Sequence, residues 1–217
     1  MSNYQEKLSS IQSKLGHAKL LIVSKTRAES EIEAYYHLGH RDFGENRVQD
    51  LLDKARNLEK KCPEIRWHMI GHLQKNKVNQ LLSTPKLHAI HSVHDRELLD
   101  LLIAKAKSPL EIFLQFNTSK EDEKSGFMTY FELATATEDV LKQPFVKLAG
   151  LMTMGTIRTE NFESEARRCF QELQVEKLKL ESEFKLKLQT SMGMSQDYEI
   201  ALEEGSDWIR LGTMMFQ

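Results

Sequence analysis

Two hydrophobic patterns alternate along the chain. Short runs rich in β-branched and aromatic residues are almost continuously apolar, which is typical of strands buried on both faces of a sheet. The runs that we predict as strands are residues 19–24, 41–44, 66–70, 87–92, 110–117, 146–152, 186–192 and 207–212. Between them, apolar residues recur three or four positions apart, which indicates helices with one buried face.

Local signals predict where some of these helices begin and end. Asp95 can cap the helix that follows it, because its carboxylate can accept from the first free backbone N–H groups. Ser30 followed by Glu33 forms a capping-box pattern, and Gly39 is suited to end that helix. Ser195 is the expected cap of the last full helix.

The order of these segments predicts an α/β fold. Eight predicted strands, each preceded by a predicted helix, favour parallel pairing through right-handed crossovers. We therefore expect one (β/α)8 barrel of the TIM type with an extra N-terminal helix, forming a single domain over residues 1–217. A doubly wound open sheet is the alternative, although it does not need eight regular repeats. The charged run 118–125 is expected to be a solvated loop.

Composition narrows the classes of partner. The 217 residues include 30 Lys and Arg against 32 Asp and Glu, and a net charge of −2 predicts no general affinity for nucleic acid or an anionic membrane. The first residues are polar and do not resemble a signal peptide, and no apolar run approaches the ~20 residues of a membrane helix. Cys62 and Cys169 stand far apart, so we expect reduced thiols and a cytoplasmic protein.

Polar residues stand where nearly every predicted strand ends. In such barrels the active face lies at the carboxyl ends of the strands, so we expect these residues to converge on one mouth. In chain order they are Lys25, Gly44, Glu45, Asn46, His68, Gly71, His72, His91, Ser92, Asn117, Thr153, Ser191, Arg210, Gly212 and Thr213.

Lys25 directly follows the apolar run LLIV of the first predicted strand. A lysine held there is expected to be partly desolvated, which disfavours the charged form of an amine. A neutral amine can form a Schiff base with an aldehyde. The alternative is a lysine whose stem packs on the barrel rim while its ammonium group reaches water.

The last two strands carry a pattern suited to phosphate. Barrels often bind phosphate with the loops after strands 7 and 8, and here those loops contain Ser191, Gly212 and Thr213. These could equally be ordinary strand-to-helix turns. A lysine opposite a phosphate cradle nevertheless suits pyridoxal 5′-phosphate (PLP). Arg210 would then face the pyridine nitrogen and leave it unprotonated, which weakens the ring as an electron sink.

Six sequence blocks resemble the motifs of the pyridoxal phosphate homeostasis proteins. They run in the family's order over most of the chain, and this family is similar in turn to the barrel domain of alanine racemase. The blocks are IVSKT (22–26), FGENRVQD (43–50), WHMIGHLQKNK (67–77), GLMTMGT (150–156), SMGMSQDYEIALEEGS (191–206) and WIRLGTMMF (208–216).

The resemblance implies a role for particular residues. It makes Lys25 the residue that carries PLP covalently, as an internal aldimine, and it places Arg210 at the pyridine nitrogen. Positions that match the family's phosphate site are Ser191, Gly212 and Thr213. Positions that match residues near the ring or lining the pocket are Asn46, His68 and Met192. The resemblance further implies a monomeric or weakly associating protein that buffers PLP or delivers it transiently to apoenzymes that require it, without substrate turnover.

Two enzymatic alternatives remain open. The first is a PLP-dependent amino-acid racemase, which needs acid–base groups on both faces of the substrate's α-carbon. The chain is expected to lack the second domain that supplies the opposing tyrosine in racemases, and its own tyrosines fall in predicted helices: Tyr4, Tyr35, Tyr36, Tyr130 and Tyr198. The second is an unrelated barrel enzyme that uses Lys25 on a sugar phosphate. A zinc site at His68 and His72 is not expected, because no carboxylate partner lies nearby in sequence.

Overall fold

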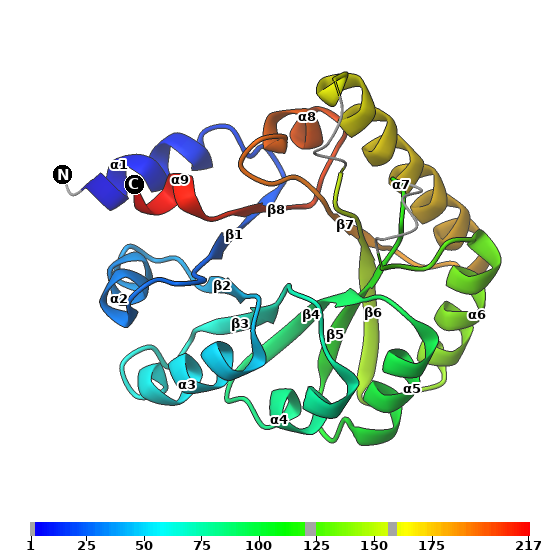
Figure 1. Cartoon of the computed structure of the whole chain (residues 1–217), viewed down its shortest axis with the longest axis horizontal. Coiled ribbons are helices and arrows are strands. Elements are labelled where there is room, and N and C mark those ends of the chain that lie inside the picture. The colour runs from blue at the N-terminus through cyan, green and yellow to red at the C-terminus, as the bar shows by residue number, and fades with distance from the viewer. Residues whose placement is uncertain (1–2, 120–124, 156–159) are drawn as a thin grey trace.

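A closed barrel of eight parallel strands forms the centre of the computed structural model, which describes residues 3–119, 125–155 and 160–217. The strands follow one another around the barrel in chain order, and β8 pairs with β1 to close it (Figure 1). They are β1 (Lys19–Val23), β2 (Asp42–Glu45), β3 (Arg66–Met69), β4 (Leu87–Val93), β5 (Leu110–Gln115), β6 (Val146–Met152), β7 (Gln189–Ser191) and β8 (Trp208–Leu211). The predicted barrel is confirmed, and each strand lies within or close to its predicted range.

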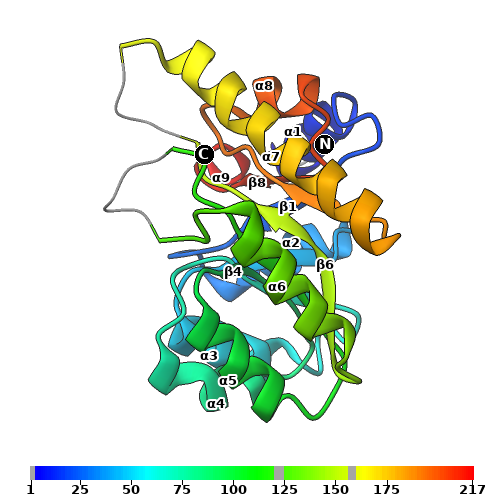
Figure 2. The ribbon, with the colours of Figure 1, turned by 90° about the vertical axis from the view of Figure 1, so that its right-hand side faces the viewer.

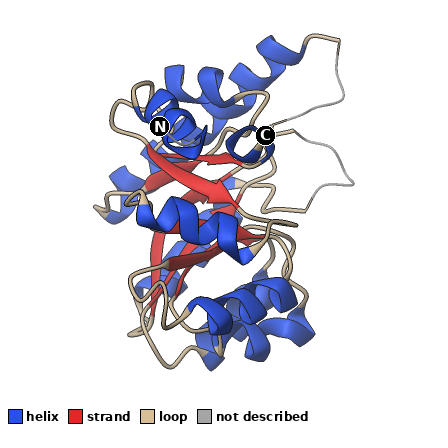
Figure 3. Ribbon diagram, turned by 90° about the vertical axis from the view of Figure 1, so that its left-hand side faces the viewer, coloured by secondary structure: helices blue, strands red, loops and turns tan. Residues whose placement is uncertain are grey.

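Helices surround this barrel (Figure 3). An extra helix, α1, precedes β1 as expected and packs beside α9, where the rings of Tyr4 and Phe216 lie 6.4 Å apart. Further along the chain, α6 and α7 lie side by side against β6 (Figure 2). The helices are α1 (Asn3–Gln12), α2 (Glu29–His37), α3 (Val48–Leu58), α4 (Val78–Leu82), α5 (Arg96–Lys105), α6 (Tyr130–Leu141), α7 (Phe162–Phe184), α8 (Tyr198–Glu203) and α9 (Thr213–Phe216), with a 3-10 turn at Lys75–Lys77.

Two of the predicted helix ends are confirmed. Asp95 precedes α5, and its Oδ1 atom accepts a hydrogen bond from the backbone N–H of Leu98 at 2.7 Å. Gly39 follows the end of α2 with a φ of +92°, a backbone conformation that residues with a Cβ rarely adopt.

Two other predicted helix starts are wrong. Helix α2 begins at Glu29. The Glu31 carboxylate accepts a hydrogen bond from the Ala28 N–H at 2.9 Å, and the Glu31 N–H donates to the Ala28 oxygen at 3.1 Å. Ser30 and Glu33 therefore lie inside the helix. Before α8, the N-cap position is occupied by Asp197 and not by Ser195, and the Asp197 Oδ1 atom accepts from the preceding Met194 N–H at 2.6 Å. This contact closes a turn that contains Ser195, and α8 starts after it, at Tyr198.

The hydrophobic residues form two separate clusters. The smaller one fills the barrel interior and consists of Leu21, Ala89, Phe113, Met152 and Trp208. The larger one lies between the barrel and its helices. Fully burying a Leu, Ile, Val, Phe or Met side chain stabilises a fold by about 1.5–3 kcal/mol. Both clusters therefore stabilise the barrel on which the strand ends are positioned. Cys62 and Cys169 are buried free thiols, as expected.

Within the described ranges, no helix is long and apolar enough to cross a membrane. The expected solvated loop at 118–125 lies largely outside the described residues, because these omit 120–124.

Candidate functional site

Lys25 lies at the mouth of the barrel, one residue beyond the buried Ser24 that follows β1. Its side chain is exposed, and the next residue, Thr26, has a positive φ of 63°. The chain therefore leaves the barrel wall at Ser24. The prediction of a partly desolvated Lys25 is wrong for this structure, whereas its predicted position at the mouth is correct.

A buried polar group holds the backbone just before Lys25. Oε1 of the fully buried Glu45 accepts hydrogen bonds from Ser24 Oγ and from Lys54 Nζ, each at 2.7 Å. Lys54 Nζ also donates to the backbone oxygen of Ser24 at 2.8 Å. Burial raises the pKa of Glu45, and the hydrogen bond from Lys54 opposes this effect. Glu45 was expected at the mouth, but its side chain instead points toward α3, and this expectation is wrong.

The end of β8 lies directly beside the end of β1. Ile22 pairs with Leu211, and a Cβ atom on Gly212 would lie 3.4 Å from the Cβ of Val23. Thr213, the first residue of α9, is exposed like Lys25. The strand pairing therefore brings the predicted lysine and the predicted phosphate-binding pair, Gly212 and Thr213, to adjacent positions on the rim.

Arg210 forms part of the floor beneath this rim. Its side chain is almost completely buried, and it donates to Ser191 Oγ at 2.8 Å and to the backbone oxygen of Thr153 at 3.0 Å. Burial lowers the pKa of Arg210 to about 10, and the nearby negative charge of Asp197 acts in the opposite direction. The guanidinium group is therefore positively charged at neutral pH, with neutral oxygen atoms as its hydrogen-bond partners.

A line of polar side chains continues from Arg210 through the barrel interior. Ser191 Oγ lies 2.8 Å from His91 Nδ1, and His91 Nε2 lies 3.0 Å from His68 Nδ1. His68 Nε2 lies 3.0 Å from Oδ1 of Asp42, which also accepts from Arg66 at the opposite end of the barrel. His91 stacks on Phe113 with ring centroids 4.2 Å apart. Ser191 and His68 are thus buried below the mouth instead of lining its rim.

The remaining predicted site residues differ in position. Asn46 is exposed beside the mouth, and its backbone packs closely on Gly71, where an added Cβ would lie only 2.2 Å from the Asn46 oxygen. Met192 is fully buried in the larger hydrophobic cluster. Thr153 is buried and contacts Thr118 Oγ1 at 2.9 Å. The structure thus brings Asn46 to the rim and does not bring Met192 there.

Histidines near the mouth form no recognisable metal centre. The rings of His72 and His94 lie 4.2 Å apart, and burial lowers the pKa of His72. His94 contacts the carboxylate of Asp95 at 3.4 Å. Across the portion of the chain that the structure describes, no group of three or more His, Cys, Asp or Glu side chains could hold a metal ion.

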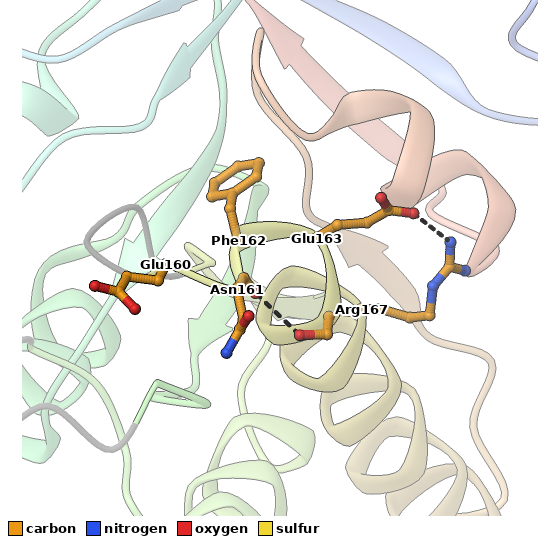
Figure 4. Close-up of a pocket in the computed structure, with 6 residues that line it drawn as sticks. Glu160, Asn161, Phe162, Glu163 and Arg167 are labelled. Carbon is orange, nitrogen blue, oxygen red and sulfur yellow. Dashed lines mark hydrogen bonds and ion pairs between the residues drawn. The ribbon is translucent and has the colours of Figure 1, made fainter.

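Surface hollows lie away from most of these residues. One lies at the start of α7, where Glu163 pairs with Arg167 at 3.8 Å and Ser164 Oγ donates to the Asn161 oxygen at 3.0 Å (Figure 4). A second hollow between α7 and α8 includes Ser195. Neither contains a residue that the sequence predicts to bind a cofactor.

Sequence reasoning missed three residues that organise the site. Asp42 forms the inner end of the polar line, Lys54 reaches the mouth from α3, and Asp197 lies near Arg210. An acidic residue inside a predicted strand could have revealed Asp42. No comparable signal was available for Lys54, because a lysine on an amphipathic helix is usually solvated.

Comparisons with known proteins match most of the chain. The family model described as the alanine racemase N-terminal domain matches residues 1–217. The pyridoxal phosphate homeostasis protein of Mus musculus is 38% identical over 212 residues, which cover 91% of this chain and 76% of the mouse protein.

Solved structures add two further similarities. PipY of Synechococcus elongatus PCC7942, solved with PLP bound, is 29% identical with a TM-score of 0.87, and the match covers 99% of this chain and all of PipY. Alanine racemase from Corynebacterium glutamicum is 14% identical with a TM-score of 0.73, covering 98% of this chain and 60% of the racemase. The racemase therefore shares the fold, and the likeness extends no further.

Proposed function

Because the chain belongs to the pyridoxal phosphate homeostasis protein family, we propose that it binds PLP at the barrel mouth and takes part in intracellular PLP homeostasis. The protein would buffer PLP or deliver it transiently to apoenzymes, without turning over a substrate. The observation that carries this proposal is the adjacency of Lys25 to Gly212 and Thr213 at the paired ends of β1 and β8.

The donor groups at the mouth fit the chemistry of PLP. The cofactor carries an aldehyde, a phosphate and a ring nitrogen, which require an amine, hydrogen-bond donors and a partner for the nitrogen. The exposed amine of Lys25 would attack the aldehyde carbon and form a Schiff base with loss of one water molecule. The Thr213 hydroxyl and the backbone N–H groups of Gly212 and Thr213 would hold the phosphate.

Arg210 would be the partner of the ring nitrogen. A guanidinium group keeps its protons, so it donates to an unprotonated nitrogen and does not protonate it. When bound, PLP supplies an electron-withdrawing ring, and this ring withdraws less strongly with an unprotonated nitrogen. Arg210 therefore favours binding and release of PLP over carbanion chemistry.

The other candidate residues take supporting positions in this proposal. Asn46, on the rim, would lie beside the ring of the cofactor. Ser191 and His68 would act below the cofactor, because their side chains are buried under Arg210. We assign Met192 no contact with PLP, since it is buried in the larger hydrophobic cluster.

Racemase activity is disfavoured by the position of the tyrosines. A racemase needs a second acid–base group opposite the lysine. Each tyrosine lies on a helix, in α1, α2, α6 or α8, and Tyr35 is buried with its hydroxyl donating to the Met215 oxygen. A Lys25-dependent racemase rate on a common amino acid would overturn this part of the proposal.

Absorbance spectra of the purified protein with added PLP test the central claim. We expect wild-type protein and Lys19→Ala to turn yellow with PLP, and borohydride to attach the PLP to them covalently. We expect no covalent attachment to Lys25→Ala. Lys19 is the matched control because it lies at the opposite end of β1, 4.9 Å from the Trp208 ring. A wild-type protein that stays colourless would overturn the proposal, and labelling that persists in Lys25→Ala would overturn the assignment of Lys25.

A further inference from the structure

Hydrogen-bond direction can be assigned along the polar line inside the barrel, because both ends are fixed. Arg210 can only donate to Ser191. Burial alone would raise the pKa of Asp42, but hydrogen bonds from His68 and Arg66 hold it well below its usual range. Asp42 is therefore an ionised carboxylate that only accepts, and His68 must carry a hydrogen on Nε2.

The surroundings of His91 favour its neutral form. The charged and titratable groups around the two imidazoles are Asp42 from β2, Arg66 from β3, His88 from β4 and Arg210 from β8, together with His40, which precedes β2. Asp42 supplies the negative charge, and two hydrogen bonds from Arg66 already balance it. A cation at His91 would be a buried charge whose hydrogen-bond partners are His68 and Ser191, with no carboxylate among them, which is costly. Burial likewise lowers the pKa of His91 well below its usual value.

If Nε2 carries the single hydrogen of His68, one arrangement of hydrogens satisfies every contact. His68 Nδ1 then accepts from His91 Nε2–H, and His91 Nδ1 accepts from the hydroxyl of Ser191. The oxygen of Ser191 in turn accepts from Arg210. Each hydrogen bond from Arg210 to Asp42 points in the same direction, away from the mouth.

We propose that His91 and His68 are positioning residues that turn the Ser191 hydroxyl inward and thereby hold Arg210 as the hydrogen-bond donor for the ring nitrogen of PLP. This inference rests on the proposed function and deepens it. The histidine line holds Ser191 against Arg210 in the place where a carboxylate could otherwise bind, so no carboxylate is hydrogen-bonded to the guanidinium group. Arg210 is held by two neutral oxygen atoms, Ser191 Oγ and the Thr153 carbonyl.

The same arrangement changes the role expected of Ser191. Its hydrogen is committed to His91 and its oxygen accepts from Arg210. Ser191 therefore supports Arg210 from below and has no hydrogen left to donate to a phosphate. Phosphate binding then depends on Gly212 and Thr213.

The hydrogen positions can be tested on the protein without PLP. Nitrogen-15 NMR of labelled imidazoles distinguishes the two tautomers and the cation. We expect His68 and His91 to be neutral, each with its hydrogen on Nε2, and the His91→Gln spectrum assigns the His91 signals. A hydrogen on Nδ1 of His91, or a doubly protonated His68, would overturn the proposed direction.

Binding measurements test the positioning role. His91→Phe preserves a flat ring on Phe113 but removes both hydrogen bonds, and we expect its PLP dissociation constant to rise about tenfold. Ser191→Ala should have a similar effect without altering the stacked ring. His91→Gln should restore most of the affinity, because an amide can accept from Ser191 and donate to His68.

A matched control separates this line from general damage to the barrel interior. His88 also contacts the His68 ring, with centroids 5.2 Å apart, but lies outside the hydrogen-bonded line. His88→Gln should bind PLP with the wild-type dissociation constant. A wild-type protein that binds no PLP would defeat the proposed function, whatever the NMR result. If the wild type binds PLP and His91→Phe and Ser191→Ala bind it equally well, the positioning role alone is wrong.

Discussion

Lys54 donates from Nζ to the backbone oxygen of Ser24 at 2.8 Å, so α3 holds the chain at the residue before Lys25. The same amine pairs with Glu45, which is fully buried, while the Lys54 side chain is 13% exposed. Removing one member of a buried pair leaves the other charge without compensation and typically costs about 3 kcal/mol or more. The contact therefore links the stability of the barrel to the position of the candidate cofactor lysine.

Lys54→Met should lower the free energy of unfolding by about 3 kcal/mol, measured by urea denaturation. The double variant Glu45→Leu/Lys54→Met should recover most of this loss, because it also removes the buried charge. Lys61→Met is the control, since Lys61 pairs with Glu33 on the surface. Equal effects of the Lys54 and Lys61 variants would contradict the assigned importance of the buried pair.

His40 should make the protein less stable in mild acid. Burial lowers its pKa to about 4, although the hydrogen bond from Nε2 to the Asp42 oxygen opposes the effect. The unfolded chain has the ordinary histidine pKa of about 6.5, so it binds more protons than the folded chain between these values. The contribution of His40 is complete above about pH 6.5 and is lost as pH falls toward 4, by about 3 kcal/mol in total.

His40→Gln tests this pH dependence. The variant keeps a side-chain donor for the Asp42 oxygen but does not titrate, so its unfolding free energy should fall less steeply between pH 6.5 and 4 than that of wild type. His37→Gln, on the exposed end of α2, should retain the wild-type slope. An unchanged slope in His40→Gln would show that other groups cause the acid sensitivity.

The barrel was predictable because burial on both faces leaves a direct mark on the sequence. Strands such as β6 (Val146–Met152) are apolar runs between polar helices, and the predicted range matches the observed one. Helix starts were less predictable. Ser30 and Ser195 have the right residue type for a cap, but nearby carboxylates in Glu31 and Asp197 make the stabilising contacts instead.

The site was predictable at its rim and less so below it. Strand order alone places Lys25 and Thr213 together, because β1 and β8 are neighbours in a closed (β/α)8 barrel whose strands follow chain order. Strand order does not reveal which way a side chain points or how deep it lies. Both Glu45 and Ser191 stand at strand ends, but Glu45 points toward α3 and Ser191 lies below the rim. Neither position could be predicted from the strand order.

Gly71→Ala should disturb the rim at Asn46. An added Cβ would lie 2.2 Å from the backbone oxygen of Asn46, so one of the two chain segments must move. We expect PLP to bind about tenfold more weakly, together with a lower unfolding free energy. Gly44→Ala is a matched control, because its Cβ would meet the movable end of the Ile70 side chain at 3.3 Å. Wild-type binding by Gly71→Ala would show that the position of Asn46 does not matter for PLP.

Thr213→Val should separate phosphate binding from the other interactions of the cofactor. Valine has nearly the same shape as threonine but lacks the hydroxyl, so the variant loses one donor to the phosphate at the start of α9. A hydrogen bond to a charged group typically contributes about 1.5–3 kcal/mol, which corresponds to at least a tenfold weaker affinity for PLP. Pyridoxal, which lacks the phosphate, should bind wild type and Thr213→Val equally, as measured by borohydride trapping on Lys25. Equal weakening for PLP and pyridoxal would mean that Thr213 acts on the fold of the rim, and unchanged PLP binding would mean that the phosphate lies elsewhere.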